Sequence, residues 1–189
     1  MSPRVAFISG PLDASDEYFA THYAPRILAA AAADDSFVIG PVRGVDTLAL
    51  QFLLDPFHDV GPSRITIFMA EFEFASRGWR QGYVEKGVKI WEEGITTRER
   101  DAAMTRESDY DILRYRTEEE TKELYGAAWW PRVSNTEMNE RRRREQRGEE
   151  VAKGGTGLQQ EVLDEEVNMR TTKTGLKKTL RGLFGDAAS

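Results

Sequence analysis

Two glycine-containing turns in the first quarter of the chain have the composition of an anion-binding site. The first turn follows an apolar run and contains three candidate ligand contacts, Ser9, Gly10 and Pro11. The second turn supplies five more, Gly40, Arg43, Gly44, Asp46 and Thr47. Glycine allows close backbone approach to a ligand, and free N–H groups at a helix start favour an anion by about 0.3–1 kcal/mol. We therefore expect a negatively charged ligand over both turns.

Each feature of these turns also has a purely structural interpretation. Glycine after a strand is often only a turn residue, Asp46 could cap its own helix, and Arg43 could be a solvated side chain. The ligand-binding interpretation gains weight because two such turns on consecutive parallel strands open at one edge of the sheet. That edge is where ligands bind in α/β proteins.

Three further charged residues could take part in the chemistry. Arg100 lies near the start of a predicted helix, where positive charge is unfavourable unless it meets an anionic ligand or neighbouring acidic side chains. Glu71 and Glu73 lie two residues apart at the end of a predicted strand and therefore on one face of it. They could serve as an acid–base pair, or they could be solvated side chains at the end of the strand. The chain has two histidines and no cysteine, which excludes thiolate and multi-histidine metal sites. We expect no metal and no cofactor, and the catalytic residues stay unassigned.

The elements that position these residues alternate between strands and helices. Apolar or alternating runs predict strands at 5–8, 36–39, 64–74, 88–91 and 110–115. Helical spacing and capping boxes predict helices at 13–33 with a break at Pro25, and at 46–54, 96–107 and 117–126. Such alternation implies parallel strands joined by crossovers, so we expect an α/β fold with a Rossmann-like three-layer parallel sheet.

The charge distribution separates a body from a tail. Residues 1–131, the expected nucleotide-binding domain, hold 14 Lys and Arg against 22 Asp and Glu, which opposes broad nucleic-acid binding. Residues 132–189 are expected to be a mostly helical or flexible tail, with a solvated helix or linker over 132–160. A short basic amphipathic segment, 176–184, is expected to dock on a partner or on the body. No apolar run approaches the roughly 20 residues that span a bilayer, and no signal peptide is evident, so we expect a cytoplasmic protein.

The second turn and its helix resemble a known superfamily. Gly-Pro-Val-Arg-Gly-Val-Asp-Thr-Leu-Ala, residues 40–49, is similar to the second-strand loop of the SLOG superfamily of Rossmann-like nucleotide-binding proteins, which includes the Lonely Guy and DNA-processing Smf families. Phe-Ile-Ser-Gly at the first strand end and Arg100-x-x-x-Met104 followed by Ser108-Asp109 fit the same order. The resemblance spans residues 4–125 and implies a ligand over Gly10, Arg43, Gly44, Asp46, Thr47 and Arg100.

The resemblance does not extend to the catalytic pattern of the Lonely Guy branch, which removes ribose 5-phosphate from cytokinin nucleotides. That branch has Pro-Gly-Gly-x-Gly-Thr-x-x-Glu, whereas here Pro41, Val45 and Leu48 replace Gly, Thr and Glu. Asp101 stands where the branch has a lysine after its arginine. A weaker resemblance, an opening strand followed by Ser-Gly-Pro, is to nucleoside deoxyribosyltransferase-like proteins.

Three functions therefore stay open. The first is a module that binds a nucleotide or nucleotide-derived ligand. The second is an N-glycosidic hydrolase or transferase acting on nucleoside monophosphates, such as a phosphoribohydrolase-like enzyme, with Asp13, Asp46 or Glu71 as the carboxylate near the sugar. The third is a non-catalytic protein-interaction module. Four tryptophans either cover the sheet or form a subunit contact, which makes a homodimer one of the expected partners: Trp79, Trp91, Trp129 and Trp130.

Overall fold

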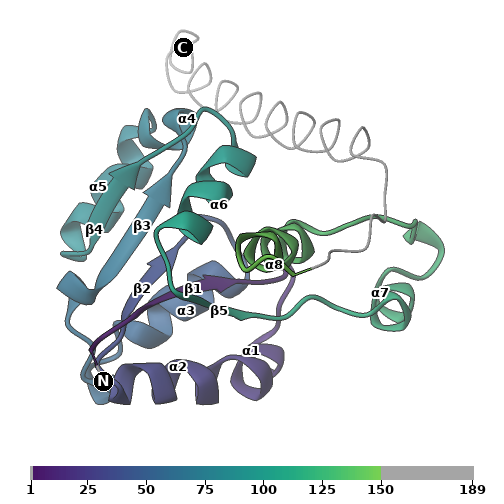
Figure 1. Ribbon diagram of the computed structural model, residues 1–189, viewed down its shortest axis with the longest axis horizontal. Helices are drawn as coiled ribbons and strands as arrows, with labels where there is room; N and C mark the ends of the chain where they lie inside the picture. The colour runs from purple at the N-terminus through teal and green to yellow at the C-terminus, as the bar shows by residue number, and fades with distance from the viewer. Residues whose placement is uncertain (1, 150–189) are drawn as a thin grey trace, which may run out of the picture. The chain divides into compact units, whose positions relative to one another are not determined.

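A computed structural model describes residues 2–149 as a five-stranded, all-parallel sheet between two layers of helices (Figure 1). The strands are β1 (Val5–Ser9), β2 (Ser36–Ile39), β3 (Ile65–Met69), β4 (Lys89–Glu92) and β5 (Tyr110–Leu113), in the spatial order β4-β3-β2-β1-β5. The predicted α/β, Rossmann-like parallel sheet is therefore confirmed. The amphipathic segment predicted at 176–184 lies outside the described residues.

One row of isoleucines crosses the whole sheet. In the strand register Ile112 lies beside Ile8, Ile8 beside Ile39, Ile39 beside Ile67, and Ile67 beside Ile90. β-Branched side chains pack well on a pleated surface, which explains why these short runs form strands. Because alternate side chains point to opposite faces, this row defines one side of the sheet, called here the isoleucine face.

Helices on the isoleucine face build the larger core. They are α1 (Asp16–His22), α2 (Ala24–Ala32), α3 (Val45–Leu53), α4 (Glu71–Phe74) and α5 (Arg77–Glu85). Pro25 lies in the first turn of α2, where a missing N–H is tolerated, so the predicted break between two helical pieces is confirmed. Short 3-10 helices, Pro56–His58 and Pro62–Arg64, connect α3 to β3.

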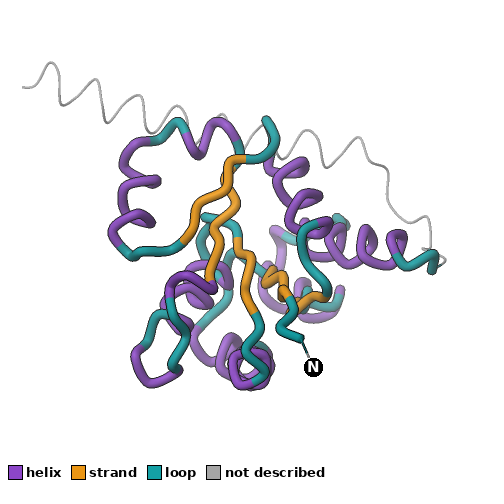
Figure 2. Tube along the Cα trace, turned by 60° about the vertical axis from the view of Figure 1, so that its left-hand side comes forward, coloured by secondary structure: helices purple, strands orange, loops and turns teal. Residues whose placement is uncertain are grey.

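The opposite side, called here the phenylalanine face, carries Phe7 and Phe68 and a smaller core. It is covered by α6 (Thr97–Arg106), through Ala103 and Met104, and by α8 (Asn135–Gln146), which packs on α6 and β5. Figure 2 shows the strands in the interior with helices around them. No helix within residues 2–149 combines the length and apolar character needed to cross a bilayer.

The chain order places the loops that follow the strands, including both predicted turns, at one end of the sheet. Successive strands from β1 to β4 step in one direction, and the connection through α6 then returns to β5 on the other side of β1. All five strands are parallel, so their carboxyl ends lie at one edge, called here the carboxyl rim. The loops that follow the strands therefore gather at this rim, which is where ligands bind in parallel α/β sheets.

The third strand is shorter than its sequence suggests. We expected it to run over 64–74 with Glu71 and Glu73 on one face of its end, but β3 ends at Met69 and α4 follows. The helix forms because the Glu73 carboxylate accepts a hydrogen bond from the backbone N–H of Ala70 at 2.8 Å, which caps the first turn. Glu71 is exposed and Glu73 is buried, so the two do not act as a pair.

The compact body extends past the expected boundary at residue 131. Residues 132–160 were expected to be a solvated helix or linker, but α8 packs on the sheet with Thr136, Asn139 and Arg143 buried. Its attachment is polar: Arg143 donates to the Ser108 carbonyl at 2.6 Å and to the Asp111 carboxylate at 2.9 Å. Hydropathy gives no sign of such a contact, because the side chains that make it are charged.

After β5 the chain forms α7 (Glu118–Tyr125) and a 3-10 turn, Gly126–Ala128. The capping boxes predicted at Thr96 and Thr117 open α6 and α7. The chain then reaches α8 through residues 129–134. Residues 5–128 thus contain all the strands of the described part of the chain, and α8 closes the phenylalanine face beside β5.

Candidate functional site

The two predicted turns lie against each other at the carboxyl rim. The N–H of Val45, the first residue of α3, donates to the Pro11 carbonyl at 3.2 Å. Gly44 has a positive φ of 82°, and a Cβ there would overlap the Pro11 carbonyl oxygen and the Leu12 backbone. The close approach of the loops after β1 and β2 therefore requires glycine at this position.

The space between the two turns is filled by the protein itself. A Cβ on Gly10 would overlap the Val45 side chain and the Tyr23 hydroxyl. That hydroxyl lies 3.0 Å from the Ser9 carbonyl and 2.9 Å from the Arg114 carbonyl, and it accepts from the Arg114 N–H. The predicted convergence is present, but the Val45 N–H is used within the fold. The space between the two turns is therefore occupied by side chains of the protein.

A buried charged network lies beneath this rim. Arg100 is 3% exposed and donates to Glu73 Oε1 at 2.5 Å and to Asp101 Oδ1 at 2.8 Å. Asp46 comes from α3 on the isoleucine face, whereas Arg100 comes from α6 on the phenylalanine face, and both approach Gly40 at the end of β2. A Cβ on Gly40 would lie 2.6 Å from Asp46 Oδ2 and 3.5 Å from Arg100 Cζ, so only glycine leaves room for both.

Two further elements contribute to the network. Asn139 of α8 donates through Nδ2 to Ser9 Oγ at 3.0 Å and reaches Asp101 Oδ2 at 3.5 Å. On the other side, the Tyr83 hydroxyl of α5 donates to the Pro41 carbonyl at 3.4 Å. The network thus links residues from β1, α3, α4, α6 and α8: Ser9, Asp46, Glu73, Arg100, Asp101 and Asn139.

Acidic groups outnumber basic ones in this network. Three carboxyl groups surround one guanidinium, and all four side chains belong to buried residues. Burial, with the negative charge of Asp101 and Glu73, raises the pKa of Asp46 well above its ordinary value, although Arg100 and the Val42 backbone oppose the shift. Burial, together with the acidic groups of Asp46 and Glu73, raises the pKa of Tyr83 to about 12, although Arg100 opposes the shift. Burial therefore favours the neutral form of the Asp46 carboxyl, the form that can donate a hydrogen bond or a proton.

The structure divides the predicted site residues into three groups. Ser9, Gly40, Asp46 and Arg100 meet in or beside the buried network. Gly10, Pro11 and Gly44 pack the two turns together. Arg43 and Thr47 are exposed on the second turn, where the Thr47 hydroxyl donates to the Val42 carbonyl at 2.9 Å.

Of the carboxylates considered for glycosidic chemistry, only Asp46 belongs to the network. Asp13 pairs instead with Arg116 and accepts from the Tyr125 hydroxyl at 2.5 Å, and Glu71 is exposed. Sequence reasoning missed the roles of Glu73, Asp101 and Asn139. The adjacency of Asp101 to Arg100 was an available signal, but nothing local marks Asn139, which is 130 residues from Ser9 in the chain.

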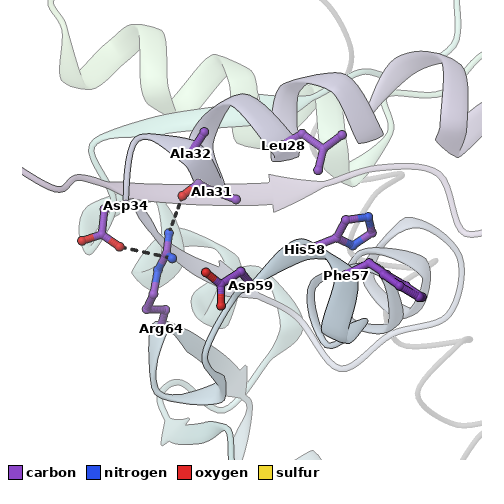
Figure 3. A pocket seen from close by; sticks show the side chains of 8 residues that line it. All are labelled: Leu28, Ala31, Ala32, Asp34, Phe57, His58, Asp59 and Arg64. Atoms are coloured by element: carbon purple, nitrogen blue, oxygen red, sulfur yellow. Dashed lines mark hydrogen bonds and ion pairs between the residues drawn. The ribbon is translucent and has the colours of Figure 1, made fainter.

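A separate hollow of about 480 Å³ lies near the opposite, amino end of the strands (Figure 3). It is lined by Leu28, Ala31, Ala32, Asp34, Phe57, His58, Asp59 and Arg64. Arg64 donates to the Ala31 carbonyl at 3.0 Å and pairs with Asp34 at 3.2 Å, so its charge is already satisfied. None of the predicted ligand contacts lines this hollow.

Within residues 2–149 no group of three or more His, Cys, Asp or Glu side chains is arranged to hold a metal ion. The sequence matches no protein-family model, and comparisons with curated proteins and with solved structures found no match. The chemistry of the carboxyl rim is therefore the basis on which a function can be assigned.

Proposed function

We propose that this protein binds a nucleotide or nucleotide-derived ligand at the carboxyl rim of its sheet. The observation that carries the proposal is the buried charged network directly beneath the two meeting turns. Ionisable groups in the interior are unfavourable unless paired, and clusters with perturbed pKa values occur preferentially at functional sites. The position also coincides with the ligand edge of parallel α/β sheets and with the site implied by the SLOG resemblance, and we propose membership of that superfamily.

The composition of the rim favours different parts of such a ligand at different places. Carboxyl groups are in excess in the network, so nearby ligand groups should be hydrogen-bond donors, such as ribose hydroxyls or the amino group of a base. Arg43 is exposed on the second turn and offers a planar cation for a phosphate. A ligand with a phosphate at one end and hydroxyl groups at the other satisfies both requirements.

The binding proposal is tested with a panel of nucleosides and nucleoside mono- and diphosphates, using thermal stabilisation followed by calorimetry. Arg43→Ala should weaken phosphate-bearing ligands by about tenfold to a hundredfold, because one charge-assisted contact is lost. The affinity for the matching nucleoside should not change. Arg4→Ala is the control, since Arg4 is also exposed but lies before β1, at the amino end of the sheet. If no member of the panel binds, the proposal is wrong.

A second candidate function, cleavage of an N-glycosidic bond, is favoured by the raised pKa of Asp46. A neutral carboxylic acid can protonate the departing base while water attacks the sugar carbon, as in other acid-assisted glycosidic reactions. Chromatography of nucleoside monophosphates incubated with the protein would detect free base. Asp46→Asn should abolish release while ligand binding persists, whereas stabilisation without free base supports binding alone. If the protein neither releases free base nor is stabilised by any of these compounds, the alternative of a non-catalytic protein-interaction module is favoured.

A further inference from the structure

Strand β4 is an edge strand of the sheet formed by residues 2–149. Among the strands of residues 2–149 it pairs only with β3, with Thr66 beside Lys89 and Met69 beside Glu92. The N–H of Glu93 donates to the Met69 carbonyl at 2.9 Å, so the backbone groups of alternate residues, Lys89 and Trp91, also point toward β3. The N–H and C=O groups of Ile90 and Glu92 therefore point outward. Such an edge is a template for pairing with another strand.

Exposed apolar side chains are concentrated around this edge. Trp91 is 51% exposed and Ile95 is 68% exposed, while Trp79 and Val84 of α5, which packs on β4, are 41% and 54% exposed. Nine large apolar side chains are exposed in the described part of the chain, and these four all fall within residues 79–95. Figure 1 shows β4 and α5 together at the end of the sheet away from β5. Exposed apolar side chains on an edge strand and on the helix beside it favour an interaction at this edge.

We propose that β4 pairs with β4 of a second copy of this chain, antiparallel and centred on Trp91, so that two five-stranded sheets become continuous. A two-fold axis perpendicular to the sheet relates the two strands, which keeps equivalent faces on the same side. In this register Ile90 lies opposite the partner's Glu92. These are the residues whose backbone groups point outward, so each such pair exchanges two hydrogen bonds.

The side chains at this edge are complementary to themselves in the same register. Trp91 meets the partner's Trp91 at the centre, and Lys89 lies opposite the partner's Glu93 on the same face. Lys89 is exposed, and the Glu93 side chain is 39% exposed. Opposite charges directly across an antiparallel pair are stabilising. The neighbouring register, centred on Ile90, would place Lys89 opposite the partner's Trp91 and Glu93 opposite the partner's Gly87, so the pair of opposite charges would be lost. Charge complementarity therefore selects a second copy and one register.

The first test measures association by sedimentation over a wide range of concentrations of the full chain. The wild type should form a concentration-dependent dimer, and Lys89→Glu should weaken it by about tenfold, because each substitution acts twice across a two-fold axis. Lys89→Glu combined with Glu93→Lys should restore association. Lys122→Glu makes the same charge change on α7 and should leave the dimer unaltered. A monomer at every concentration, or a dimer insensitive to Lys89→Glu, would overturn the proposal.

The second test fixes the register by cross-linking, which is clean because the chain has no cysteine. Trp91 and the partner's Trp91 form a non-hydrogen-bonded pair with Cα atoms about 4.5 Å apart, a separation that a disulfide can span. Trp91→Cys should give a disulfide-linked dimer on mild oxidation, whereas Ile90→Cys, opposite the partner's Glu92, should not. Circular dichroism confirms that each variant is folded. Folded Trp91→Cys that forms no linked dimer refutes this register.

Discussion

Replacing Arg100 with methionine tests whether the buried charged network has the electrostatic balance described above. Methionine retains most of the length of the side chain but removes the guanidinium that contacts Glu73 at 2.5 Å and Asp101 at 2.8 Å. Both carboxyl groups then remain in the interior beside Asp46 without their positive partner. The expected result is a large loss of stability.

The magnitude follows from burial. The side chains of Arg100, Glu73 and Asp101 are 4%, 2% and 8% exposed, so solvent screens their interaction little. Removing one member of such a buried pair costs about 3–5 kcal/mol. For a domain of this size that corresponds to a fall in Tm of about 6–20 °C.

Urea unfolding followed by tryptophan fluorescence measures the change. Arg106→Ala is the matched control, because Arg106 lies on the same helix, is 56% exposed, and contacts Glu93 and Glu107. An exposed ion pair contributes less than about 1 kcal/mol, so the control should unfold near the wild-type midpoint. If Arg100→Met also loses less than about 1 kcal/mol at neutral pH, the guanidinium does not balance the network and the reasoning is refuted.

Two further predictions concern the same rim. Asp46→Asn should stabilise the protein increasingly as pH rises above the ordinary value of 3.8, by up to about 1.4 kcal/mol per pH unit. Because the pKa of Asp46 is raised in the folded state, wild-type stability is lost as pH rises through that pKa, whereas the variant has no such loss. A difference in the free energy of unfolding between the two proteins that does not change with pH would contradict this prediction. Gly44→Ala should destabilise far more than Gly126→Ala in thermal melts, because both have positive φ but only Gly44 faces packed backbone. Equal losses would show that loop contact is unimportant.

Much of the fold could be predicted from the sequence because its determinants are local. The capping boxes at Thr96 and Thr117, the break at Pro25 and the strand 36–39 all depend on residues within a few positions of one another. The same local logic failed for Glu73. The run Glu71-Phe72-Glu73 alternates like a strand end, yet a capping bond to Ala70 and the pairing with Arg100 make it helical.

The alternation of strands and helices can be predicted from the sequence, and it implies that the loops after β1 and β2 share one rim, since parallel strands leave no other arrangement. The contents of that rim depend on how the chain folds in three dimensions. Val45 fills the space between the turns, and Asp46, Glu73 and Arg100 meet from three helices around Gly40. These contacts join residues far apart in the chain. Their burial in one place raises the pKa of Asp46, and no local sequence pattern encodes that effect.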